Sequence, residues 1–190
     1  MWGLLLASVI ALAVIAVMLA AYTRFTTLRT RVLRGWHELD AALGERHMLV
    51  PTLVDTVRRQ GPHDARLLDT ATSCNLRAMA VRREADAQAV AEQALEGVLR
   101  QVIAAGDRHP ELRWNPAFRA LEHELSEIED RIQELRVAYN ADTRSFDRLV
   151  QTFPTLIFAH MFGFAPEPYF ELEPSVDYLS TSPVDLSPWI

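Results

Sequence analysis

Histidine and carboxylate side chains are the residues of this sequence whose spacing could support metal chemistry. A di-iron site in a helical bundle needs Glu-x-x-His pairs on two helices, and none of the six histidines has that spacing. His37-Glu38 also lacks a histidine at position 41, which the helical zinc motif of metalloproteases requires. We therefore predict no metal ligands. The histidines on helical stretches are interpreted as solvated or locally bonded: His37, His47, His123 and His160.

The densest acidic run, residues 122–130, could coordinate a hard cation such as Ca²⁺, which prefers oxygen ligands. Arginines stand close to it in the sequence, at Arg119, Arg131 and Arg136. Opposite charges three or four residues apart pair along a helix surface, so a solvated helix flank is the favoured interpretation. The sequence also has no Gly-rich phosphate loop and no Gly-x-Ser-x-Gly turn. We nominate no catalytic or cofactor-binding residue and expect the protein not to be an enzyme.

Composition excludes further kinds of function. All 19 basic residues are arginine, which removes Schiff-base chemistry, a lysine general base and the lysine of a phosphate loop. A net charge of −6, with arginines scattered among acidic residues, offers no broad cationic face for nucleic acid. Cys74 is the only cysteine, so no internal disulfide or thiolate cluster forms. We interpret it as a buried, inert thiol.

The first 23 residues carry no charged side chain and form a predicted transmembrane anchor, residues 1–23. Residues 2–22 are apolar or small, and a helix of about 21 residues, at about 1.5 Å per residue, crosses the hydrocarbon core of a bilayer. A cleaved signal peptide is the alternative, but it has a basic leader and a shorter apolar run. An interfacial helix would need a charged face. We expect residues 2–22 to contact membrane lipid.

A cluster of arginines follows the anchor, before the first acidic residue of the chain: Arg24, Arg29, Arg31 and Arg34. Arginine-rich flanks of a membrane span stay in the cytoplasm. We therefore expect a single-pass protein of the cell membrane with its N-terminus outside and the rest of the chain in the cytoplasm. The same arginines could meet anionic lipid headgroups, although a topology signal is the simpler interpretation.

Apolar residues spaced by three or four predict a long amphipathic helix after the anchor and continuous with it. They are Val32, Trp36, Leu39, Leu43, Val50, Leu53 and Val57. Pro51 predicts a kink or a short break in this helix. Two further helices should bury faces of small residues, which are Leu67, Ala71, Cys74, Ala78 and Val81 on the second and Ala87, Ala91, Ala94 and Val98 on the third.

The last helix has the clearest pattern. Asn115-Pro116 opens it with a cap residue and a first-turn proline. Its apolar seam is Phe118, Leu121, Leu125, Ile128, Ile132, Leu135, Tyr139, Phe146, Leu149 and Phe153. Short connections make successive helices antiparallel. The expected fold is therefore all-α, an up-down-up-down four-helix bundle with long first and last helices.

Residues 24–170 form the predicted bundle, including an aromatic C-terminal segment. Pro154 should end the last helix, and the aromatic residues from Phe153 to Phe170 are dense enough to pack back onto the bundle. This segment could instead form a partner groove or contact the membrane surface, but packing at the membrane-proximal end is favoured. Residues 171–190 contain prolines, serines and acidic residues and no base, which predicts a poorly ordered acidic tail.

A series of short motifs extends from the anchor to about Phe170. The most specific are Glu124-Leu125, Glu129, Arg131-Ile132, Arg136, Tyr139-Asn140, Phe153-Pro154, Phe162-Gly163-Phe164 and Pro168-Tyr169-Phe170. Weaker ones are Arg46, Leu49, Pro51, Leu53-Val54 and Val57, then His109-Pro110-Glu111-Leu112 before Asn115 and Phe118. In this combined order the motifs resemble the LemA family. The chain departs from the family pattern at Phe146-Asp147, where a second aromatic-asparagine pair is usual, and in the acidic extension after Phe170. The resemblance implies a membrane-anchored helical bundle and supplies no catalytic residues.

Two binding functions fit these observations. The first is a non-catalytic envelope protein that positions an unidentified protein partner at the membrane through its long helices. The second is an accessory or regulatory subunit of a membrane enzyme such as a protease. An enzyme with an unrecognised site is the least supported class. A second copy of the chain is also a candidate partner, whereas nucleic acid is not.

Arg46 stands where the seam of the first long helix expects an apolar residue, and we predict that it pairs with Glu129. Arg46 precedes Gly61 by 15 residues and Glu129 follows Asn115 by 14, so both lie about 21 to 22 Å below the same end of the bundle. Glu122 is the reserve partner if the loops shift the register. The alternative is that Arg46 extends along the seam edge into water.

Overall fold

The computed structural model describes residues 2–59, 65–81, 85–153 and 155–170. Within these residues it is helical and has no strand, which confirms the predicted all-α class. The helices are α1 (Trp2–Arg59), α2 (Ala65–Ala80), α3 (Ala85–Asp107), α4 (Pro110–Arg113), α5 (Pro116–Gln151) and α6 (Thr155–Phe162). The sequence predictions for Pro154 and the acidic tail, residues 171–190, lie outside the described residues, as does Gly61, from which the level of Arg46 was counted.

α1 is one helix of 58 residues, about 87 Å long at about 1.5 Å per residue. The apolar N-terminal segment and the amphipathic segment are therefore continuous, as the sequence predicts. Pro51 lies inside the helix at an exposed position. The helix continues past it to Arg59, so this proline causes no break.

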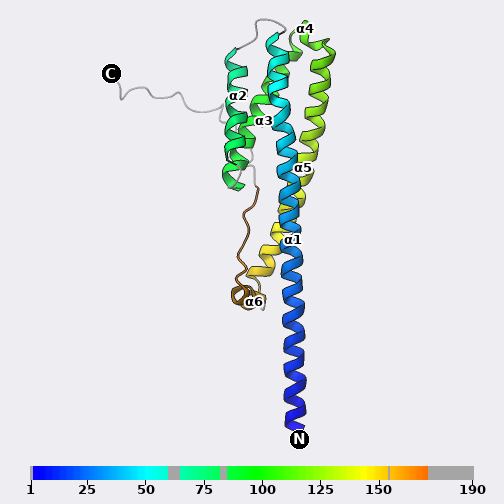
Figure 1. The fold of residues 1–190 in the computed structure, drawn as a ribbon, viewed down its shortest axis with the longest axis vertical. Helices are drawn as coiled ribbons and strands as arrows, with labels where there is room; N and C mark the ends of the chain where they lie inside the picture. Colours follow the sequence, from blue (N-terminus) through cyan, green and yellow to red (C-terminus); the bar gives the residue numbers. More distant parts are fainter. Residues whose placement is uncertain (1, 60–64, 82–84, 154, 171–190) are drawn as a thin grey trace, which may run out of the picture.

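Among the described residues, α1 alone contains a stretch long and apolar enough to cross a membrane. This stretch projects beyond the other helices (Figure 1). Its exposed large apolar side chains are those of Trp2, Leu5, Leu6, Val9, Ile10, Leu12, Val14, Ile15, Val17 and Leu19. No packing within the described chain accounts for a helix that is apolar on every side, whereas a lipid environment would.

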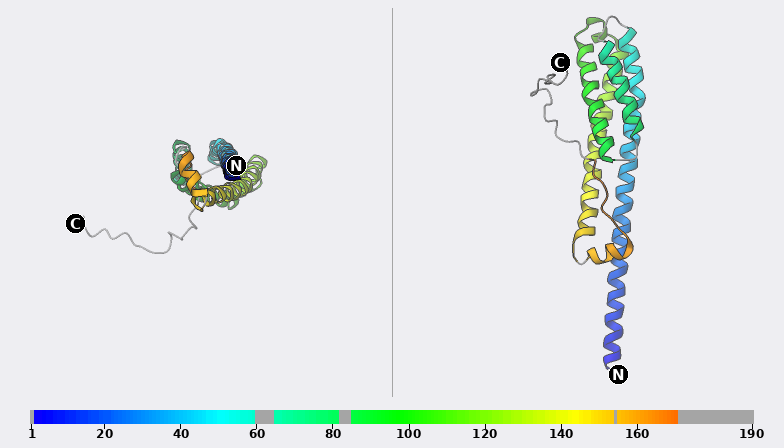
Figure 2. Two further views of the ribbon diagram at one scale, coloured as in Figure 1. Left: turned by 90° about the horizontal axis from the view of Figure 1, so that it is seen from below. Right: turned by 90° about the vertical axis from the view of Figure 1, so that its left-hand side faces the viewer.

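The remaining helices lie along the other part of α1. α1 and α3 run in one direction, α2 and α5 in the opposite one (Figure 1). α5 contacts α1 along much of its length, and the α2–α3 pair packs on the half of α1 that is remote from the N-terminus. α6 lies at the C-terminal end of α5 and crosses beside α1 (Figure 2).

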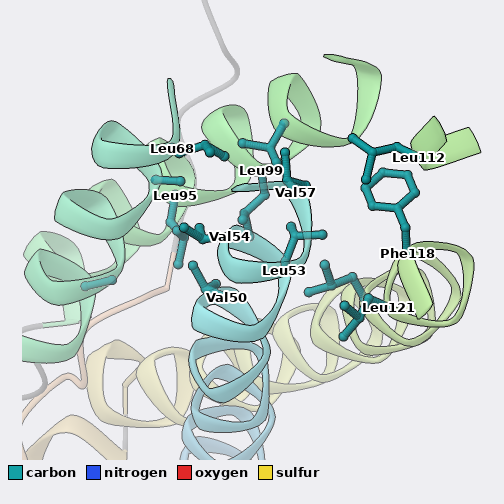
Figure 3. Close-up of a cluster of buried hydrophobic side chains, with 14 of the residues drawn as sticks. Val50, Leu53, Val54, Val57, Leu68, Leu95, Leu99, Leu112, Phe118 and Leu121 are labelled. Atoms are coloured by element: carbon teal, nitrogen blue, oxygen red, sulfur yellow. The ribbon is translucent and has the colours of Figure 1, made fainter. Parts of the chain in front are cut away.

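Two groups of buried apolar side chains hold these helices together. The first, the distal core, joins α1, α2, α3, α4 and α5 through residues such as Leu53, Leu68, Leu95, Leu112 and Phe118 (Figure 3). The second, the proximal core, joins α1, α5 and Ala89 of α3 to the C-terminal segment and includes Phe25, Leu39, Ile132, Phe146 and Phe170. The cores meet at the level of Arg46, which lies between Leu43 of the proximal core and Val50 of the distal core along α1.

The predicted inner faces of α2 and α3 were wrong in part. On α3, Ala94 is exposed, and the buried residues among those described are Gln88, Ala89, Ala91, Glu92, Leu95, Leu99, Val102 and Gly106. On α2 the buried residues are Leu68, Ala71, Asn75 and Ala78. Alanines give a weak apolar stripe because each buries little area, so the leucines determine which face turns inward. Buried polar residues also interrupt the apolar spacing of these faces, namely Asn75 on α2 and Gln88 and Glu92 on α3.

α5 begins and packs as the sequence predicts for most of its length. The side-chain oxygen of Asn115 accepts hydrogen bonds from the backbone N–H of Ala117 at 2.8 Å and Phe118 at 3.2 Å. The seam from Phe118 to Phe146 is buried or half-buried. Phe153 is the exception, with 76% of its surface exposed, because α5 ends at Gln151 and the helical period stops before it.

We expect Gly106→Ala to destabilise the fold, because a Cβ at this position of α3 would lie 2.3 Å from Cζ of Phe118. Phe118 is fully buried, and such overpacking costs about 1–3 kcal/mol. Gly97→Ala in the same helix is the control: its Cβ meets no atom within 4 Å, and alanine favours a helix by about 0.5–1 kcal/mol. Thermal unfolding of the full chain in neutral detergent, followed by circular dichroism, should show a lower Tm for Gly106→Ala alone. Equal Tm values would contradict this packing.

Candidate functional site

Arg46 lies at the centre of a polar cluster that replaces apolar packing between the two cores. Its side chain is buried on α1, with 2% of the residue exposed. Nη1 donates to Oε2 of Glu129 on α5 at 2.7 Å, and Nη2 donates to Oε2 of Glu92 on α3 at 2.5 Å. The contact with Glu129 expected from the sequence is present. The contact with Glu92 was not foreseen.

Two further polar side chains extend this ion pair, and a third is buried one turn before Glu92 on α3. His47 is buried beside Arg46, and its Nε2 lies 3.2 Å from Oε2 of Glu92. Asn75 of α2 donates from Nδ2 to the backbone carbonyl of His47 at 3.2 Å. Gln88 of α3 is fully buried. The cluster therefore draws on α1, α2, α3 and α5. His47 was expected to be solvated or locally bonded, which was wrong, because the Arg46–Glu92 pair brings a carboxylate from another helix to it.

The charge of Glu92 is set by its surroundings. Burial, the largest effect, raises the pKa of this carboxyl, but the hydrogen bond from His47 and the positive charge of Arg46 outweigh burial and hold the pKa below its usual value. A carboxyl whose pKa is lowered by folding stabilises the fold above its unfolded-state pKa, and that contribution disappears as pH falls through the folded-state value. The cluster therefore stabilises the protein at neutral pH and does so less in acid.

Glu122, the reserve partner, does not contact Arg46. It accepts a hydrogen bond from Arg119 on its own helix at 2.5 Å. Glu122 and Arg46 nonetheless line one cavity of about 400 Å³ between α3 and α5, together with Glu129. The pair of Glu122 with Arg119, three residues away on α5, is in keeping with a solvated helix flank, whereas Arg131, just after the acidic run, pairs with Glu45 of α1. Within the described parts of the chain, no group of three or more histidine, cysteine or acidic side chains could hold a metal ion.

The motif residues of α5 hold the C-terminal segment. The Tyr139 hydroxyl donates to the carbonyl of Pro168 at 2.6 Å. Asn140 binds the backbone of Phe170 twice, donating from Nδ2 to its carbonyl and accepting from its N–H at Oδ1, both at 3.0 Å. Two turns along α5, Oδ1 of Asp147 accepts from the N–H of Glu167 at 3.2 Å. We call Tyr139, Asn140 and Asp147 the α5 clamp.

Aromatic rings fill the space between α1, α5 and the clamped segment. Phe164 stacks on Phe25 with ring centres 4.8 Å apart, and Trp36 lies 5.9 Å from Phe170. The aromatic segment therefore packs on the helices, as favoured from the sequence, with Phe170 fully buried. Part of it stays exposed, including Phe153, Ile157 and Met161. The packed part agrees with the favoured interpretation, and the exposed side chains are the part that a partner or the membrane surface could contact.

Sequence reasoning located Arg46, Glu129, Tyr139 and Asn140 but missed Glu92, His47 and Gln88. A signal existed for Glu92: positions 88, 92, 95, 99 and 102 have helical spacing, and the last three are Leu95, Leu99 and Val102. A carboxylate in such a row is expected only where a buried cation meets it. Arg46 was that cation, but the regular spacing of the small residues of α3 led to a different face of this helix being predicted as buried.

Comparison with known families supports the sequence resemblance. A family model described as the LemA family matches residues 35–182. The match begins in α1 beyond the apolar stretch and includes the polar cluster and the α5 clamp. It also continues past Phe170, so the expectation that the shared pattern stops there was wrong. No curated protein matches the chain.

We expect Arg46→Met to lower the free energy of unfolding by about 3–5 kcal/mol, because Glu92 would stay buried without its cation. The control is Arg58→Met, which breaks a solvent-exposed pair with Asp69 and should cost about 0–1 kcal/mol. The double variant Arg46→Met/Glu92→Gln should cost less than the sum of its parts. Denaturant unfolding of the full chain in detergent gives these values, and additive effects would mean that Arg46 and Glu92 do not interact.

We expect Asn140→Asp to loosen the C-terminal segment, since a carboxylate oxygen would face the carbonyl of Phe170 in place of the amide donor. Leaving that acceptor unpaired costs about 1–3 kcal/mol. Asp147→Asn is the control, because its oxygen still accepts from the N–H of Glu167. Amide hydrogen exchange should accelerate at Phe170 in Asn140→Asp and stay unchanged at Glu167 in Asp147→Asn. Unchanged exchange at Phe170 in Asn140→Asp, together with faster exchange at Glu167 in Asp147→Asn, would refute the role assigned to the clamp.

Proposed function

The chain belongs to the LemA family, and on this premise we propose that it is a non-catalytic, single-pass membrane protein of the cell envelope that holds a protein partner at the membrane. One observation carries the proposal: α1 runs without interruption from an exposed apolar stretch into the packed helices. Because the helix has no break between the two parts, it holds the domain at a set distance from the membrane. The domain then has a fixed height and direction above the lipid surface.

The fold that we propose for this domain is an up-down-up-down four-helix bundle of α1, α2, α3 and α5. Alternating helix directions support it (Figure 1), as does the polar cluster, to which each of the four helices contributes a side chain. A bundle with long first and last helices leaves α1 and α5 paired below the α2–α3 pair. The paired segments of α1 and α5 are the part of the domain that lies nearest the membrane.

The arginines after the apolar stretch support a cytoplasmic domain with the N-terminus outside. Arg24, Arg31 and Arg34 are exposed on α1 just beyond the stretch. Positive charges at one end of a membrane span keep that end in the cytoplasm. Residues 1–23 themselves carry no charged side chain.

The surface that we propose for the partner is a groove of about 690 Å³ between α1 and α2. Met48, Leu76 and Met79 line it and are exposed by 70%, 62% and 46%. Methionine side chains adapt to differently shaped apolar partners and are common at surfaces that bind helices. The groove lies on the part of the domain remote from the anchor, within reach of proteins in the cytoplasm near the membrane.

Capture from membranes through a C-terminal tag tests this function. We expect the full chain to capture a partner. Met48→Glu/Met79→Glu should capture at least about tenfold less of it, because two charges would be buried in the interface. Val137→Glu should capture as much as the unchanged chain. Val137 is a matched control, since it is 64% exposed on α5 outside the groove. Protein lacking residues 1–23 should move to the soluble fraction. Equal capture by both glutamate variants would exclude the groove, and a copurifying hydrolase would favour the accessory-subunit alternative.

A further inference from the structure

The end of the helical domain nearest the apolar stretch contains a second groove, between α1 and the C-terminal end of α5. Its volume is about 770 Å³, and it is lined by residues that include Arg24, Thr27, Arg31, Ser145, Arg148 and Phe153. Thr23, the first lining residue, directly follows the apolar residues 2–22. In a protein anchored by that stretch, the groove opens at the height of the lipid headgroups.

This groove, which we call the basal groove, carries charges of one sign only. It is lined by three arginines and no acidic residue, although the chain as a whole has 25 acidic and 19 basic residues. Within the described residues, Arg24, Arg31 and Arg148 form no ion pair, whereas Arg29 on the same stretch of α1 has Glu167 at 3.8 Å. Like charges gathered in one groove repel one another, and an anion between them would remove that repulsion.

The donors left free in the groove favour phosphate over an uncharged ligand. Thr27 already donates to the carbonyl of Thr23 and Ser145 to that of Ala141, so their hydroxyl protons are used within their own helices. The charged donors that remain are the guanidinium groups. A planar guanidinium offers two parallel N–H groups that match two oxygens of a phosphate.

The surroundings of the groove identify the source of that phosphate. Leu28, Leu149 and Phe153 form an apolar wall beside the arginines, and Phe153 is 76% exposed. α6 follows at once and runs across the axis of α1 (Figure 2), with Ile157 and Met161 exposed. Tyr22 meets Phe162 of α6, with ring centres 5.3 Å apart, so this apolar surface lies where α1 would leave the lipid.

We infer that the basal groove binds the phosphate headgroup of an anionic phospholipid in the leaflet that faces the helical domain. The three arginines bind the phosphate oxygens, and the apolar wall contacts the adjoining part of the lipid. The inference rests on the proposed anchor for its source of phosphate but not on the partner groove. Lipid binding here would fix the rotation of the domain about α1, which an anchor of one helix leaves free.

Calorimetric titration of the full chain in nonionic detergent and phosphate-free buffer tests this site. The probes are short-chain phosphatidylglycerol, short-chain phosphatidylcholine and inorganic phosphate. Arg31→Gln/Arg148→Gln removes one groove arginine from α1 and one from α5. Arg34→Gln/Arg144→Gln, which removes the same charge from the same helices outside the groove lining, is the control. Dissolved short-chain lipids reach the groove whether or not residues 2–22 span a membrane, so a failure here is distinct from a failure of the anchor.

We expect phosphatidylglycerol to bind more tightly than the other two probes. The groove variant should weaken its affinity about 25-fold, about fivefold for each of its two arginines, and the control variant should leave the affinity unchanged. Circular dichroism should show equal helix content in all three proteins; if the double variant unfolds, Arg148→Gln alone should weaken binding about fivefold. Equal affinities for the two lipids, an equal loss in both variants, or inorganic phosphate binding as tightly as phosphatidylglycerol would overturn the inference.

Discussion

The desolvation of one guanidinium constrains the relative placement of the helices. Arg46 lies where the seam would otherwise hold an apolar side chain, and a buried cation is tolerated only when carboxylates meet it. Glu92 and Glu129 do so from α3 and α5, at 2.5 and 2.7 Å. A shift of either helix by one residue would take its carboxylate out of reach. The pair therefore fixes the register of three helices, whereas apolar contacts alone tolerate sliding and rotation.

This register matters because α1 belongs to both halves of the molecule. Above Arg46 it packs in the distal core with α2, α3, α4 and α5. Below Arg46, in the proximal core, α5 and the clamped C-terminal segment are its main partners, and Ala89 of α3 also contributes. The α5 clamp fastens that segment through backbone hydrogen bonds, so Phe164 and Phe170 complete the proximal core where no third long helix is present. The segment thus substitutes for the α2–α3 pair near the apolar stretch.

The errors of the sequence prediction have a common origin. The inner face of α3 was misassigned because its alanines are spaced as regularly as its leucines, and because Glu92 and Gln88 look like surface residues until Arg46 is placed beside them. Phe153 was assigned to the seam by period alone, but α5 ends before it. Asp147 was noted only as a departure from a motif, whereas it makes the contact expected of a clamp residue, since a carboxylate oxygen accepts the N–H of Glu167 as an amide oxygen would.

The sequence by itself determined the helical class, the apolar stretch, the cap at Asn115, the seam of α5 and the need for a partner to Arg46. These follow from local rules: helical period, capping chemistry and the cost of burying charge. Tertiary structure alone decided that Glu92 joins Glu129, that His47 is buried, and that Arg24, Arg31 and Arg148 share one groove. Such contacts join residues from different helices, and their distances depend on rotations that no single helix's pattern contains.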